Sequence, residues 1–130
     1  MVLLMFLCGC TAKSSHDDGQ IDLDLTFLDD SLAYVQLVSI IKEPAEYIGK
    51  RIRLKGAHST LFNGYSGSCY HECTIQDLTL CCAQGIEFTV NDKNYPEEGE
   101  IIILSGTLDL FEEGKHSCCY VRDAVYTREE

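Results

Sequence analysis

The stretch Arg51-Ile52-Arg53-Leu54-Lys55-Gly56 alternates polar and apolar residues, a pattern typical of a half-buried β-strand. The stretch Ile86-Glu87-Phe88-Thr89-Val90 alternates in the same way and predicts another strand. Turn-forming residues at 63–68 and elsewhere separate three further strands, which we expect at 69–77, 100–110 and 116–124. The longest of these is expected to bend at Gly106. The chain therefore contains five predicted strands.

A helix is predicted before the first strand, because apolar residues recur there at intervals of three and four: Leu28, Leu32, Val35, Val38 and Ile41. Asp29, Asp30 and Ser31 are candidate N-caps for this helix. Pro44 is expected at the first position of a short helical turn, which Gly49 ends. The strands thus follow one helix and one helical turn.

This order of elements predicts a mainly β protein, a small five-stranded antiparallel barrel of the OB type with one N-terminal helix. The barrel domain is expected to span residues 29–130. A five-stranded open sheet packed on the helix is the alternative fold. The sequence shows no internal repeat and no second domain, and 130 residues suit one domain with a modest core.

The charge of the chain excludes one class of partner. Lys and Arg number 10 against 21 Asp and Glu, which gives a formal net charge of -11. Nucleic acids are bound through phosphates on a basic face, and the basic residues of this chain form no cluster. We therefore expect no nucleic-acid partner. A surface of this charge favours cations, cationic peptides or neutral ligands.

The N-terminal residues are typical of a targeting signal and not of a folded element. Residues 1–7 form an apolar run far shorter than the ~20 residues that span a bilayer. Leu7-Cys8-Gly9-Cys10 resembles the bacterial lipobox, which implies that Cys10 is lipidated and becomes the mature N-terminus. We expect residues 1–9 to be a signal-peptide remnant and residues 10–28 an acidic tether. A lipid such as palmitate would anchor the tether at the extracytoplasmic face of the cell membrane. The alternative is a buried N-terminal strand.

A specific run, Cys81-Cys82-Ala83-Gln84-Gly85-Ile86-Glu87-Phe88, follows Cys73-Thr74-Ile75-Gln76-Asp77. Together with segments at 24–26, 43–50, 54–56 and 119–124, it resembles an uncharacterised family of small bacterial lipoproteins with an OB-like domain. The resemblance covers about residues 24–126. It implies an OB-like barrel in the cell envelope and brings no established activity. A fainter similarity, in the vicinal cysteines, to envelope proteins encoded beside zinc-regulated permeases implies zinc as a ligand.

The eight cysteines require an explanation of their own. Six lie in the predicted barrel, and export to an oxidising compartment favours disulfides among them. Four thiolates, or thiolates with imidazole, are also a tetrahedral zinc site, and thiolates suit other soft metals. The third alternative is that free cysteines pack as small apolar residues. All three explanations stay open at the level of sequence.

The family resemblance divides the cysteines into two groups. Four fall on positions shared with the family and are the first candidates for metal ligands: Cys73, Cys81, Cys82 and Cys119. A turn around residues 80–84 is needed if neighbouring cysteines are to bind one ion. The other two cysteines of the barrel are Cys69 and Cys118, and we expect them to form a disulfide with each other. Alternatively, they form an accessory metal site together with two histidines: Cys69, His71, His116 and Cys118. We expect His16 and His58 to have no partner.

The sequence contains no catalytic signature. Nucleophile-elbow, Walker-type, His-Glu-x-x-His, dinucleotide-binding and Cys-x-x-Cys motifs are all missing from it. We expect a binding protein and not an enzyme. The predicted function is that of a membrane-anchored extracytoplasmic lipoprotein that binds a soft metal such as zinc through a cysteine cluster. The alternative is a disulfide-stapled structural or protein-interaction module of the envelope that binds no metal.

Overall fold

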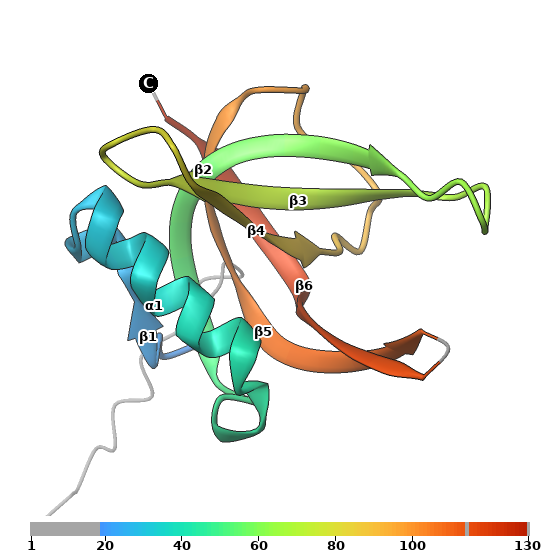
Figure 1. Cartoon of the computed structure of the whole chain (residues 1–130), viewed down its shortest axis with the longest axis horizontal. Helices are drawn as coiled ribbons and strands as arrows, with labels where there is room; N and C mark the ends of the chain where they lie inside the picture. The colour runs from blue at the N-terminus through green and yellow to red at the C-terminus, as the bar shows by residue number, and fades with distance from the viewer. Residues whose placement is uncertain (1–18, 114, 130) are drawn as a thin grey trace, which may run out of the picture.

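A computed structural model describes residues 19–113 and 115–129 (Figure 1). The described elements are, in chain order, β1 (Leu23–Asp24), the 3-10 turn η1 (Leu25–Phe27), α1 (Asp30–Lys42), the 3-10 turn η2 (Pro44–Glu46), β2 (Arg51–Phe62), β3 (Cys69–Gln76), β4 (Ala83–Phe88), β5 (Ile101–Glu113) and β6 (His116–Arg128). The five long strands and the helix match the elements expected from the sequence. β2 and β6 are each longer than expected.

Strands β2–β6 close into a barrel, so the predicted OB-like barrel with one N-terminal helix is confirmed. The sheet order is β1-β2-β3-β4-β6-β5, and pairing of β2 with β5 completes the ring. Four of the five barrel contacts are antiparallel, whereas β4 and β6 run parallel. The expectation of a purely antiparallel barrel was therefore wrong in this one contact. An odd number of strands cannot alternate in direction around a closed ring, so one neighbouring pair must be parallel.

The core fills the barrel from alternate strand positions and from one face of the helix. Ile52 and Leu54 of β2 are fully buried, as the alternation at 51–56 predicts. The helix buries the stripe Ala33, Leu37 and Ile40, which packs on the end of the barrel. The more conspicuous periodic residues Leu32 and Val35 are instead 55% and 57% exposed. The predicted N-cap is confirmed, because Asp29 Oδ1 accepts a hydrogen bond from Leu32 N–H at 2.9 Å.

The described chain packs on the barrel before the helix begins. β1 pairs in parallel with β2, and Asp24 Oδ2 accepts from Arg53 Nη1 at 3.1 Å. Leu25 is buried in the core. Residues 23–28, part of the segment that the sequence assigns to the tether, thus join the fold. The signal peptide and Cys10 lie outside the described residues. In the described part of the chain, no helix is both long and apolar enough to cross a membrane.

Two glycines permit the strand packing. A Cβ added at Gly56 in β2 would lie 2.5 Å from the Thr74 carbonyl oxygen and 2.9 Å from Cys73 Sγ. A Cβ added at Gly106 in β5 would overlap the Val121 side chain. The β5–β6 register shifts between Ser105 and Thr107, which agrees with the irregularity expected at Gly106.

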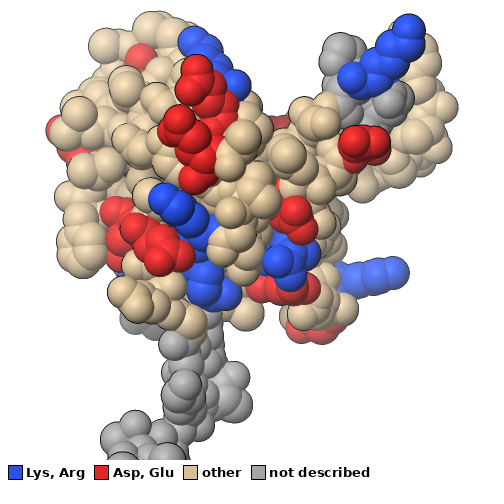
Figure 2. Space-filling view, turned by 90° about the horizontal axis from the view of Figure 1, so that it is seen from below, with Lys and Arg blue, Asp and Glu red and all other residues tan. Residues whose placement is uncertain are grey.

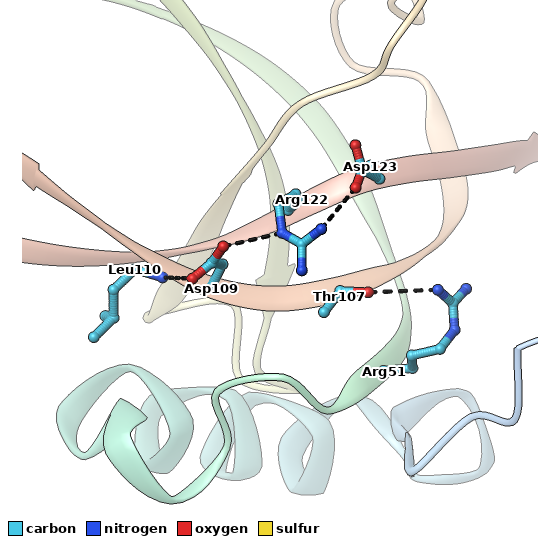
Figure 3. A network of polar contacts seen from close by, with 6 residues as sticks. All are labelled: Arg51, Thr107, Asp109, Leu110, Arg122 and Asp123. Carbon is cyan, nitrogen blue, oxygen red and sulfur yellow. Dashed lines mark hydrogen bonds and ion pairs between the residues drawn. The ribbon is translucent and has the colours of Figure 1, made fainter.

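The outer surface carries charges of both signs. Arg122 of β6 binds Asp109 of β5 at 2.9 Å and Asp123 at 2.8 Å, and Arg51 of β2 donates to Thr107 at 3.5 Å (Figure 3). On the face drawn in Figure 2, acidic and basic side chains are interspersed, and no continuous basic surface is seen there.

Candidate functional site: the thiol turn between β3 and β4

The turn that joins β3 to β4 brings three ligand-type side chains together. Asp77, Cys81 and Cys82 offer one carboxylate oxygen and two sulfurs, all within 4.8 Å of one another, the one such group of three among the described residues. Cys81 Sγ lies 3.5 Å from Cys82 Sγ and 3.8 Å from Asp77 Oδ2. Both cysteines are exposed, so a solute can reach them. We call this group the thiol turn.

Backbone geometry explains how two neighbouring cysteines reach the same place. Asp77 N–H donates to the Cys82 carbonyl at 3.0 Å, and Leu80 N–H donates to the Asp77 carbonyl at 3.0 Å. Leu80 takes a φ of 60°, in the left-handed region. Neighbours on a regular strand point to opposite faces, and this turn removes that restriction. A turn is therefore present, but it lies at residues 77–82 and not at 80–84, because Ala83 and Gln84 already belong to β4.

Two further residues orient the groups of the thiol turn. Thr79 Oγ1 donates to Asp77 Oδ1 at 2.7 Å and lies 2.9 Å from Cys81 Sγ. Hydrogen bonding from Thr79 is the main reason why the pKa of Asp77 is lowered, so the carboxyl group stays ionised. On α1, the Tyr34 hydroxyl is in hydrogen-bonding reach of Cys82, and burial followed by the charge of Cys82 raises the pKa of Tyr34.

Two of the three distances within the thiol turn are close to those between neighbouring ligands of a tetrahedral zinc ion. Zinc binds sulfur at ~2.3 Å and carboxylate oxygen at ~2.0–2.2 Å, so two such ligands of one ion lie about 3.5–3.8 Å apart. The separations measured from Cys81 Sγ, 3.5 Å to Cys82 Sγ and 3.8 Å to Asp77 Oδ2, agree with this spacing. Asp77 was not among the candidate ligands expected from the sequence, although its place at the end of the predicted strand 69–77, beside the cysteine turn, was a usable signal.

Cys73 and Cys119, which the family resemblance groups with Cys81 and Cys82, are not members of this group. Cys73 is fully buried, opposite His58 on β2 and Ile86 on β4. Burial raises the pKa of the Cys73 thiol to about 12 and that of Cys119 to about 11. At both positions burial therefore favours the thiol over the thiolate.

The accessory residues are also placed apart from the thiol turn. Cys69 lies opposite Phe62 and Cys118 opposite Phe111, and all six described cysteines are free thiols. The expected Cys69–Cys118 disulfide is therefore not formed in the structure. Both residues instead line one groove, described below. The backbone of His116 lies in β6, and its side chain is outside the described part.

His58 was expected to have no partner, and this expectation was wrong. His58 Nδ1 lies 3.0 Å from the Glu97 carbonyl oxygen, and His58 Nε2 lies 2.8 Å from His71 Nδ1. His71 also stacks on Tyr95, with ring centroids 3.5 Å apart. The sequence held a signal for this contact, because His58 continues the inward-facing positions of Ile52 and Leu54 along β2.

Comparison with known proteins finds no matching family model, curated protein or solved structure. The fold and the site therefore define the class by themselves: an acidic OB-like barrel with an exposed, thiol-rich turn between β3 and β4. The resemblance to small bacterial lipoproteins stays a prediction.

Proposed function

We propose that this protein is an extracytoplasmic binding module, tethered to the membrane through Cys10, which binds a soft metal ion through Cys81, Cys82 and Asp77. The observation that carries the metal site is the 4.8 Å grouping of two sulfurs and one carboxylate oxygen. The tether rests on the sequence 7–10 and the acidic segment after it.

Electrostatics in the thiol turn favours a bound cation. The pKa of Cys82 is raised, first by its hydrogen bond with Cys81 and then by the charges of Cys81 and Asp77. The Asp77 carboxylate and the thiolates of Cys81 and Cys82 therefore repel one another when all three are ionised. A bound divalent cation relieves this repulsion. Thr79 holds the carboxylate in place, as outer partners of metal ligands commonly do.

The ligand chemistry indicates zinc or a similar thiophilic ion. Two thiolates and a carboxylate leave one position of a tetrahedron for water or for a group of a partner molecule. Copper(I) prefers sulfur alone, and hard ions such as magnesium prefer oxygen alone. An exposed site with an open position lets a metal ion enter and leave, and we propose a carrier or sensor task for it.

The experiment is a titration of the reduced full-length chain with cobalt(II) and zinc. Cys8 and Cys10 are replaced by Ser, so that neither competes for metal. We expect one equivalent of cobalt(II) with a thiolate-to-cobalt charge-transfer band, displaced by zinc. Cys81→Ser and Cys82→Ser should each remove the band, and Asp77→Asn should weaken binding. Cys69→Ser, which changes another exposed thiol, is the matched control.

Two results would overturn the metal site. The first is unchanged cobalt binding by the Cys81→Ser/Cys82→Ser double variant. The second is a chain, exported and purified in air, that carries no metal and whose Cys81 and Cys82 alkylate only after reduction. That second result would favour the alternative function, a disulfide-stapled envelope module without metal.

A further inference from the structure

The barrel is open along part of the contact between β4 and β6. The two strands pair only at Glu87 with Tyr120 and at Phe88 with Val121. At the N-terminal ends of both strands, residues 83–86 and 116–119, no described pairs join them, and a groove of about 480 Å³ lies between these ends. Its walls come from α1, the β2–β3 hairpin, β4 and the β5–β6 hairpin. The residues that line it include Ile41, Asn63, Tyr70, Glu72, Gly85 and Phe111.

The groove exposes strand edges. β4 pairs with β3 on one side, and at residues 83–86 no described strand pairs with its other side. β6 similarly pairs only with β5 at residues 116–119 within the described part. The Gly85 carbonyl accepts a hydrogen bond from the side-chain amide of Gln84 at 2.8 Å, where a neighbouring strand would otherwise donate. An extended peptide pairs readily with an edge of this kind.

The groove is acidic. Glu72 and Glu87 are directly opposite each other on β3 and β4, both line the groove, and its lining contains no Lys or Arg. Lys115, at the tip of the β5–β6 hairpin, is exposed and is not part of the lining.

Glu72 is the carboxylate through which the negative charge of the groove acts. Its carboxylate lies over Gly85, where a Cβ would overlap it. Among the described residues it has no hydrogen-bond or ion-pair partner. Burial raises the pKa of Glu72, because water is partly removed and no cation replaces it. Tyr70 and Phe111, with Phe111 packed edge-on against Tyr120 at 5.3 Å, supply apolar surface for the stem of a long basic side chain.

We propose that this groove binds an extended peptide segment of a partner protein, with a Lys or Arg of the segment on the Glu72 carboxylate and its backbone along the free edge of β4. The two lining carboxylates repel nucleic acid. A free amine or metal cation would use the carboxylates alone, whereas a peptide uses the strand edge as well. The groove shares no residue with the thiol turn, so this proposal is independent of the metal site.

The test uses the full-length chain with Cys8 and Cys10 replaced by Ser, and a labelled heptapeptide, Lys-Thr-Lys-Val-Lys-Thr-Lys, blocked at both ends. The matched control peptide has Glu in place of every Lys. We expect the Lys peptide to bind, with chemical-shift changes at the backbone amides of residues 83–87, and the Glu peptide not to bind. Glu72→Gln should weaken binding at least tenfold. Glu43→Gln, which removes an exposed carboxylate outside the groove, should leave binding unchanged.

Three results would overturn the proposal: equal binding of both peptides, equal loss in the Glu72 and Glu43 variants, or full competition by spermidine without shifts at residues 83–87. The last result would assign the groove to free polyamines. Comparing the two peptides on the unaltered groove keeps the test decisive even if Glu72→Gln disturbs folding.

Discussion

His58 Nε2 lies 2.8 Å from His71 Nδ1, so two imidazoles of neighbouring strands share a hydrogen bond at the wall of the barrel. The Glu97 carbonyl can only accept, and it therefore fixes His58 Nδ1 as a donor. Neutral His58 then accepts at Nε2 from His71 Nδ1–H. The pair keeps this bond with one added proton on His71, and loses it when both rings are protonated, because both nitrogens of a charged imidazole are donors.

The histidine pair predicts a loss of stability on acidification. Burial, and then the charge of His58, lowers the pKa of His71 below its ordinary value of 6.5, while Glu98 opposes this shift. The folded state therefore binds fewer protons than the unfolded state near this pH, and the free energy of unfolding falls as pH drops through 6.5. Urea unfolding across this range measures the slope. His71→Gln should have a flatter slope, and an identical slope in that variant would contradict the assignment to His71.

The strands and the helix were predictable, because the alternation and spacing of apolar residues are local properties of the sequence. The side-chain contacts between these elements were not predictable in this way. The alternation at 51–56 marks buried Ile52 and Leu54 correctly, but it does not say that His58 faces His71. Helix periodicity located α1 but marked a stripe that includes exposed Leu32, because Leu32 and Leu37 are equally apolar and only the position of the barrel decides which of them is buried. Asp77 joins the cysteines through a turn with a left-handed residue, Leu80, which spacing alone does not indicate.

The close approach of β2 and β3 at Gly56 predicts a sharp effect of one methyl group. In Gly56→Ala the new Cβ meets the Thr74 carbonyl at 2.5 Å, and that backbone atom cannot move without disturbing the strand. We expect a loss of about 1–3 kcal/mol in the free energy of unfolding. Gly64→Ala, where nothing lies within 4 Å of the new Cβ, is the control and should change stability by no more than about 0.5 kcal/mol. Equal effects in urea unfolding would disprove the packing argument.

Cys73 should be inert until the protein unfolds. Its thiol is fully buried, and burial raises its pKa to about 12, so the reactive thiolate is scarce near neutral pH. Alkylation with iodoacetamide, followed by mass spectrometry of peptides, should label exposed Cys69 early and Cys73 only in denaturant. Labelling of Cys73 at the rate of Cys69 in the native protein would contradict the burial.

The proposed anchor predicts a change of compartment. Replacing Cys10 by Ala removes the thiol that would carry lipid, and the protein should move from the membrane fraction to the soluble fraction of expressing cells. Cys8→Ala, two residues away, should stay with the membrane. Retention of Cys10→Ala in membranes after a salt wash would disprove the lipid anchor.

Metal binding at the thiol turn should depend strongly on pH. A metal-bound cysteine must lose its proton, and the pKa of Cys82 is raised by Cys81 and Asp77, so protons compete with the metal at neutral pH and below. With two thiols to deprotonate, we expect the apparent zinc affinity to rise roughly 10- to 100-fold per pH unit while both are protonated. Competition with a chromophoric chelator measures this slope.

Two variants separate the roles of the ligands. Cys82→Ser removes one ionisable ligand and should both weaken zinc binding and flatten the pH slope. Asp77→Asn should weaken zinc binding and leave the slope nearly unchanged, because Asp77 is already ionised. An affinity independent of pH would mean that the ion is held by groups other than these thiols.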